Sequence, residues 1–161
     1  MNAQPREKHL LTPEGYRELT EELAYLVNVR RPEVAEHIRQ AKSDGDVMEN
    51  AAYLEAKNEQ AFLEGRIKTL EALLKSATVV QEDDRQSDGT ITFGSRVTVV
   101  AQDDEGPETY QVVGSAEADP MGGKISVESP LGKALLGRKE GDQVVVDTPA
   151  GPMRFRILKC E

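Results

Sequence analysis

The chain has 161 residues, of which 38% are hydrophobic, 4% aromatic and 30% charged. This composition is more typical of long exposed helices than of one thick globule, and the length allows two small domains. The net charge of −9 argues against tight unaided binding to naked DNA or RNA, because that affinity depends on Lys and Arg side chains that displace phosphate counterions. The single cysteine, Cys160, excludes an internal disulfide and argues against a zinc site built from cysteines.

The first residues carry no targeting signal. Met1 to His9 are polar and lack the apolar core of a signal peptide. No apolar run approaches the roughly 20 residues that span a bilayer. We therefore expect a cytoplasmic protein without a membrane segment.

Apolar spacing predicts that the first half of the chain is helical. Thr12, Pro13 and Glu14 are typical of a helix start. The apolar residues that follow recur every three or four positions, as on one helix face: Tyr16, Leu19, Leu23 and Leu26. Pro32, within Arg30-Arg31-Pro32-Glu33, predicts a kink or a short break, because proline lacks the helical N–H.

A second helix is predicted after a turn. Val34, Ile38 and Ala41 continue the first stripe, and Lys42 to Asp46 are rich in turn residues. The next stripe has heptad spacing and consists of Tyr53, Ala56, Gln60, Leu63, Ile67, Leu70, Leu74 and Ala77. Two helices of about 30 residues joined by a turn pack antiparallel, as a rod about 40 Å long.

The second half of the chain is predicted to be a small α+β globule. Its expected strands are 96–100, 109–113, 124–127, 143–147 and 153–158. Ser129, Pro130 and Gly137 mark the start and the end of one short helix. The sequence thus predicts an α+β protein of two domains, with a helical hairpin at 1–80, a linker at 81–89 and a globular domain at 90–161.

The turn of the hairpin concentrates acidic side chains. Asp44, Asp46 and Glu49 lie within a few residues of one another. In one interpretation Asp46 and Glu49 form a capping box and suit the positive helix end. In the other, the carboxylates enter a deep site in a partner and supply oxygen ligands to Mg²⁺, whose remaining ligands the partner provides. One carboxylate has two oxygens, so the two roles are compatible.

These residues resemble a known family. The segment from Asp44 to Tyr53, Asp-Gly-Asp-Val-Met-Glu-Asn-Ala-Ala-Tyr, closely resembles the bacterial GreA/GreB transcript cleavage factors, and GreA in particular. The resemblance continues through Arg30-Arg31-Pro32-Glu33 and Glu64-Gly65-Arg66-Ile67. It extends into the second half at Phe93-Gly94, Val113-Gly114, Glu117-Ala118-Asp119, Ile125 to Pro130 and Thr148-Pro149-Ala150-Gly151.

The resemblance implies a transcription elongation factor that is not itself an enzyme. In that family an N-terminal coiled coil enters the secondary channel of RNA polymerase, and an FKBP-like globular domain docks on the rim. Asp46 and Glu49 match the tip acids that help to hold a Mg²⁺ ion jointly with the polymerase. The polymerase then cleaves the RNA 3′ end of backtracked, arrested complexes.

Other residues acquire expected roles by the same resemblance. Lys42 and Lys57 match basic residues near the tip and are expected to contact the nascent RNA, with solvated helix surface as the alternative. The residues expected to dock on the polymerase rim are Asp119, Pro120, Ser129 and Pro130, with simple turn chemistry as their alternative. Contact with the DNA of the transcription complex is expected to be indirect. The apolar seam is filled within the hairpin itself, and this predicts a monomer.

Two other functions stay open. A relative that occupies the same channel as an inhibitor of transcription would keep the fold, although both cleavage acids are present here. The globular domain alone is also compatible with a peptide-binding or peptidyl-prolyl isomerase module, although such a pocket needs more aromatics than the globule offers.

Overall fold

The structure is a computed structural model, and it describes residues 9–43, 51–81, 88–102 and 106–161. Contacts divide the chain into two compact units. One unit is Tyr16–Ala77, and the other combines Met1–Gly15 with Thr78–Glu161. None of the helices in the described ranges has the length and apolarity needed to span a bilayer.

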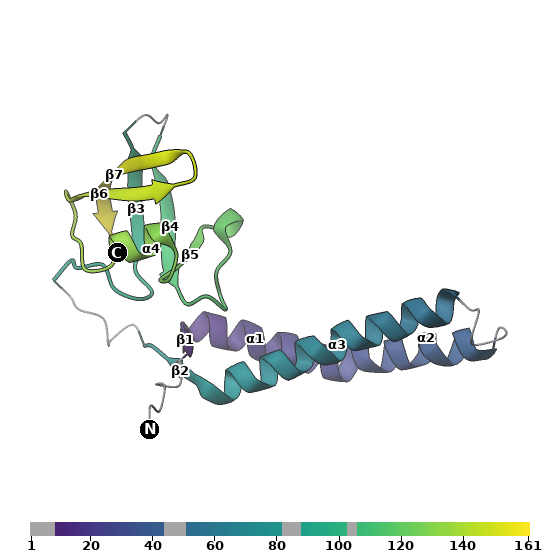
Figure 1. The fold of residues 1–161 in the computed structure, drawn as a ribbon. Coiled ribbons are helices and arrows are strands. Elements are labelled where there is room, and N and C mark those ends of the chain that lie inside the picture. Colours follow the sequence, from purple (N-terminus) through teal and green to yellow (C-terminus); the bar gives the residue numbers. More distant parts are fainter. Residues whose placement is uncertain (1–8, 44–50, 82–87, 103–105) are drawn as a thin grey trace, which may run out of the picture. The chain divides into compact units, whose positions relative to one another are not determined.

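The first unit is the predicted helical hairpin. Its first arm consists of α1 (Pro13–Tyr25), the π-helical turn η1 (Leu26–Arg30) and α2 (Arg31–Ser43). Its second arm is α3 (Ala51–Ser76), which runs alongside the first arm in Figure 1. The seam buries Val34, Ile38, Ala56, Leu63 and Ile67. Both predicted stripes are therefore largely confirmed, but Tyr16 is 39% exposed and does not belong to the core.

The predicted break at Pro32 is a π-helical turn. The backbone N–H of Arg31 donates to the carbonyl of Leu26, five residues earlier, and α2 begins at once. Proline at position 32 has no N–H to donate, and its ring opposes the tighter α-helical spacing. A widened turn before Pro32 accommodates it without ending the helix.

The second unit contains a curled five-stranded sheet in the order β5-β4-β3-β7-β6. The strands are β3 (Arg96–Ala101), β4 (Glu108–Val113), β5 (Lys124–Ser126), β6 (Gln143–Thr148) and β7 (Gly151–Cys160). All pairs are antiparallel except β4 with β5. The predicted strands are confirmed, while their order and the parallel pair come from the structure.

One face of this sheet is closed by the short helix α4 (Pro130–Leu135). The core contains Ile91, the buried strand residues and Leu135 of α4. As predicted, Ser129 caps the helix, since its hydroxyl oxygen accepts from the Gly132 N–H at 3.0 Å. Gly137, with φ of +80°, follows its end.

The N-terminal segment pairs with a strand that follows the hairpin. β1 (His9–Leu11) and β2 (Ala77–Val79) form a two-stranded sheet, and the Val80 N–H donates to the Leu11 carbonyl at 2.9 Å. Neither strand was predicted. Contacts also group residues up to Gly15 with the C-terminal unit, whereas the predicted boundaries placed them in the hairpin domain.

The start of α1 is held by a residue from far along the chain. The Glu117 carboxylate accepts from the Thr12 backbone N–H at 2.8 Å and from the Thr12 hydroxyl at 2.6 Å. The Thr12 hydroxyl oxygen in turn accepts from the Gly15 N–H at 3.0 Å. Thr12 is therefore the N-cap, as predicted, and the Glu117 carboxylate supports it at the positive helix end.

Candidate functional site

The two arms of the hairpin end together. α2 ends at Ser43 and α3 begins at Ala51, at the same end of the rod in Figure 1. The segment 44–50 connects them in sequence and carries Asp44, Asp46 and Glu49. These acids lie outside the described residues, so their roles as metal ligands stay predictions. In the ranges that the structure describes, no three His, Cys, Asp or Glu side chains form a group that could hold a metal ion.

The two lysines predicted to contact RNA lie on different arms. Lys42 is in the last turn of α2, and its ammonium nitrogen lies 6.0 Å from the centroid of the Tyr53 ring on α3. This distance is at the outer limit of a cation–π contact. Lys57 lies farther along α3, is exposed, and donates to Gln60 at 3.1 Å. Both ammonium groups are exposed, as a role in binding RNA requires.

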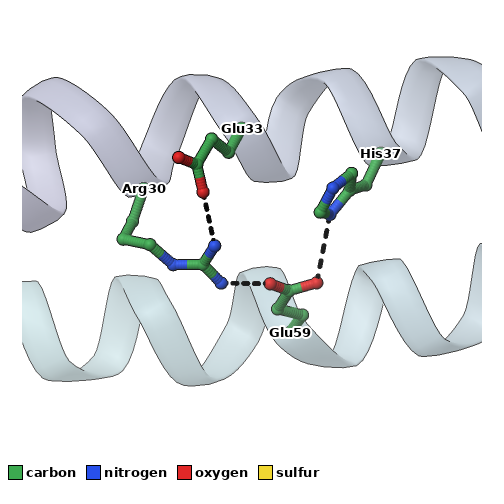
Figure 2. A network of polar contacts seen from close by, with 4 residues as sticks. All are labelled: Arg30, Glu33, His37 and Glu59. Atoms are coloured by element: carbon green, nitrogen blue, oxygen red, sulfur yellow. Dashed lines mark hydrogen bonds and ion pairs between the residues drawn. The ribbon is translucent and has the colours of Figure 1, made fainter.

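A polar network bridges the arms (Figure 2). The Arg30 guanidinium donates to Glu33 at 2.6 Å on its own arm and to Glu59 on α3. The other Glu59 oxygen lies 3.5 Å from Nδ1 of His37. The hydrogen bonds to Glu33 and Glu59 raise the pKa of Arg30. The network thus ties η1, α2 and α3 together through one glutamate.

Two further arginines bridge the same arms. Arg31 donates to Glu64 through two bonds of 2.8 and 2.9 Å, and Arg66 donates to Glu22 through two bonds of the same lengths. Such two-bond pairs fix the relative orientation of both side chains. The hydrogen bond from Arg31 holds the pKa of Glu64 below its usual value. These cross-arm pairs were not predicted, because each joins residues 33 or 44 positions apart.

The predicted docking residues occupy two places in the second unit. Asp119 bonds Lys124 through both backbone groups, at 2.8 and 2.9 Å, and precedes the 3₁₀ turn η3 (Pro120–Gly122). Met121 in this turn is fully exposed and was not predicted as a site residue. Ser129 caps α4 and also donates to the Ser126 carbonyl at 2.6 Å, so it has a structural role.

Two of the predicted docking residues have accessible surfaces. Asp119 and Pro120 are exposed beside Met121, and Pro130 is exposed as the first residue of α4. Among the polar contacts of the described residues, none joins the 119–120 pair to the 129–130 pair. A docking role for all four residues stays a prediction.

Comparison with known proteins agrees with this architecture. The family model "Transcription elongation factor, N-terminal" matches residues 9–79, and "Transcription elongation factor, GreA/GreB, C-term" matches residues 86–161. Transcription elongation factor GreA of Thermoanaerobacter pseudethanolicus is 55% identical over 150 residues, which cover 93% of this chain and 95% of the relative. The GreA of Clostridium perfringens is 50% identical over 151 residues, covering 94% and 95%.

A solved structure is also similar in sequence. GreA factor homolog 1 of Thermus thermophilus is 32% identical, with 96% of this chain and 98% of that chain covered, at a TM-score of 0.43. The two family models together span both units described above, and the curated relatives are matched over nearly their whole length. The chain belongs to the GreA/GreB family of transcription elongation factors.

Proposed function

We propose that the chain binds bacterial RNA polymerase, inserts its hairpin into the secondary channel and stimulates cleavage of the RNA 3′ end in backtracked complexes. The observation that carries this proposal is the hairpin itself. Its two arms end together at Ser43 and Ala51, and the family's acidic segment connects them. The polymerase makes the cut, and this chain is an accessory factor in the cytoplasm.

The hairpin has the length and the cross-links that delivery of a tip requires. α3 has 26 residues and is therefore about 39 Å long at about 1.5 Å per residue. Arginine–glutamate pairs join the arms at Arg30, Arg31 and Arg66. A rod joined at several points bends less than two helices that share only an apolar seam, and this supports a role in carrying the connecting segment to a distant site.

Asp46 and Glu49 provide the chemistry at that tip. Their carboxylates are hard oxygen donors of the kind that Mg²⁺ prefers, and two carboxylates leave coordination positions for the polymerase and for water. This donor set fits a shared ion rather than one bound by the isolated chain. When bound, the ion supplies activation of the water that hydrolyses the RNA backbone.

Lys42 and Lys57 support the RNA end in this proposal. Both side chains are exposed, and Lys42 lies in the turn next to the acidic segment. An ammonium group near the extruded RNA neutralises backbone phosphates. The Tyr53 ring on the other arm lies 6.0 Å from the Lys42 ammonium nitrogen, at the outer limit of a cation–π contact.

The second unit supplies the docking surface on the rim of the channel. Asp119, Pro120 and Met121 are all exposed at η3, and Asp119 immediately precedes this turn. Two backbone hydrogen bonds between Asp119 and Lys124 fix the start of this turn. The turn therefore carries the apolar Met121 side chain close in sequence to the Asp119 carboxylate. Ser129 and Pro130 contribute through the start of α4, and we propose an FKBP-like fold for the curled sheet with its helix.

The experiment measures release of RNA 3′ fragments from backtracked polymerase complexes in Mg²⁺. The wild-type chain is compared with an Asp46→Asn, Glu49→Gln double variant. An Asp44→Asn variant, which changes a neighbouring acid to which the family resemblance assigns no role, is the control. We expect the double variant to bind polymerase but to stimulate cleavage at least about tenfold less, as loss of metal-site partners does. The control should retain most of the activity.

Two outcomes contradict the proposal. Polymerase binding by the wild type without fragment release identifies an inhibitor of transcription. Equal cleavage by the wild type and the double variant assigns Asp46 and Glu49 to helix capping alone. Helical circular dichroism of each variant establishes that a loss of activity does not come from unfolding.

A further inference from the structure

A second surface lies on the face of the five-stranded sheet opposite the core. Val144 and Val146 of β6 are buried, so Gln143 and Val145 point to the other face. On β7, Arg156 is paired with Gln143 and Arg154 with Val145. Side chains paired in this way lie on the same face. The outer face of β6 and β7 therefore carries two arginines two residues apart.

Strand β3 extends both rows. Val100 is paired with Arg156, and the Gln102 N–H donates to the Arg154 carbonyl at 3.0 Å. One row across the three strands is thus Gln143, Arg156 and Val100, and the next is Val145, Arg154 and Gln102. We call these six residues the Arg154 face.

The Arg154 face is hollowed rather than flat. A cavity of about 290 Å³ is lined by residues from both rows, including Val100, Gln143 and Arg156. A neighbouring cavity of about 320 Å³ is lined by Val145, Pro152 and Met153. Gln102 and Arg154 line both cavities. The two hollows therefore adjoin at Gln102 and Arg154.

The charge on this face is not neutralised within the described parts of the chain. Arg154 and Arg156 are exposed, and neither forms an ion pair with any residue that the structure describes. In the hairpin, by contrast, Arg30, Arg31 and Arg66 each bind a glutamate. Because neither guanidinium group has a carboxylate partner among the described residues, we take them, in a protein of net charge −9, as a local site for an acidic ligand.

We propose that the Arg154 face binds an extended acidic segment of a protein partner, in which carboxylates alternate with apolar residues. Side chains two residues apart on a strand are about 7 Å apart, so the two guanidinium groups match alternate side chains of an extended peptide. Arginine binds carboxylates through paired hydrogen bonds. Val145, 57% exposed, and Val100 offer apolar contacts, and Gln102 and Gln143 offer amides for peptide groups.

The same face is poorly suited to nucleic acid. Single-stranded nucleic acid gains affinity by stacking its bases on aromatic side chains, and the Arg154 face has none. Phe155 also lines the cavity of about 290 Å³, but it is paired with the buried Val144 and packs against the core. The net negative charge of the chain also opposes a polyanion with many phosphates. The proposal does not rest on the channel-binding function.

The test measures binding of a fluorescent peptide in which glutamate alternates with valine to the full-length chain. A matched peptide has glutamine in place of glutamate. The test variant is Arg154→Gln, Arg156→Gln. The control variant, Lys68→Gln, Lys75→Gln, removes the same charge from exposed positions on α3. We expect the glutamate peptide to bind the test variant at least about tenfold more weakly than the wild type, as loss of charge-assisted hydrogen bonds predicts.

The control variant should bind the glutamate peptide within about twofold of the wild type, since only diffuse charge is lost. Equal binding of the two peptides, or equal affinities of the test and control variants, overturns the proposal. A single-stranded RNA that binds more tightly than the peptide and depends on Arg154 and Arg156 assigns the face to nucleic acid and also overturns it. Thermal melts establish that both variants fold.

Discussion

Two helical glycines have opposite surroundings. A Cβ on Gly132 in α4 would lie 1.9 Å from the backbone carbonyl oxygen of Ser126, whereas a Cβ on Gly65 in α3 would have no neighbour within 4 Å. Gly132 is buried and donates to the Ser129 cap. Close approach of two backbones therefore explains the glycine at 132, and no packing contact explains the one at 65.

We predict that Gly132→Ala destabilises the second unit by about 2–4 kcal/mol, because a backbone segment must move to admit the methyl group. Gly65→Ala is the matched control and should stabilise α3 by up to about 1 kcal/mol, since alanine favours the helix. Urea unfolding followed by circular dichroism measures both effects. Equal stability of the two variants would contradict the described approach of α4 to β5.

The contact between Thr12 and Glu117 could not be predicted from the spacing of residues in the sequence. Thr12 was predicted as the cap of the first helix, but Glu117 is 105 residues away and nothing in the local pattern connects the two. A Cβ on Gly15 would lie 2.0 Å from the Glu117 carboxyl group. An alignment of relatives in which residues 15 and 117 vary together is the signal that finds such a contact.

At the scale of elements, the ion pairs between the two arms make the stability of the hairpin depend on pH. The pKa of Glu64 is lowered by its hydrogen bonds from Arg31. A carboxyl group whose pKa is lower in the folded state stabilises that state at pH values above its ordinary pKa of 4.5. The contribution is lost as the pH falls through the lower, folded value. Because the pair is exposed, the effect is expected to be small.

We predict that Glu64→Gln lowers the melting temperature of the helical signal at neutral pH. The difference in melting temperature from the wild type should narrow as the pH falls below 4.5, because Glu64 then becomes protonated and, like glutamine, uncharged. Glu21→Gln is the control, since Glu21 is exposed and has no ion pair with a described residue. A gap that is the same at both pH values would show that the Arg31 pair does not contribute.

Elements with strong periodicity or clear capping residues were predictable, whereas β1, β2 and the π turn were not. The heptad stripe of α3 and the capping residues of α4 determined both helices, because apolar spacing and local hydrogen bonds specify them directly. β1 and β2 have three residues each, too few for an alternating pattern. The π-helical turn at 26–30 depends on which backbone hydrogen bonds form before Pro32. The presence of proline in the helix indicates only that some irregularity occurs there.

At the scale of the whole molecule, the chain consists of two compact units, and the proposed function assigns each a different task. The hairpin is stabilised by its apolar seam and by arginine–glutamate pairs, and its acidic segment follows directly after α2. The second unit has its own core and two exposed surfaces, at η3 and at the Arg154 face. A protein with a net charge of −9 is suited to binding through protein contacts rather than through the nucleic acid itself.

The most direct measurement is the Mg²⁺ dependence of RNA cleavage in backtracked complexes. If Asp46 and Glu49 supply ligands to the shared ion, then Glu49→Gln should raise the half-maximal Mg²⁺ concentration by about tenfold or more. Excess Mg²⁺ should partly restore cleavage, while polymerase affinity stays unchanged. An unchanged half-maximal concentration with a lower plateau would contradict a metal-binding role, and a wild-type chain without stimulation at any Mg²⁺ concentration would contradict the proposed function.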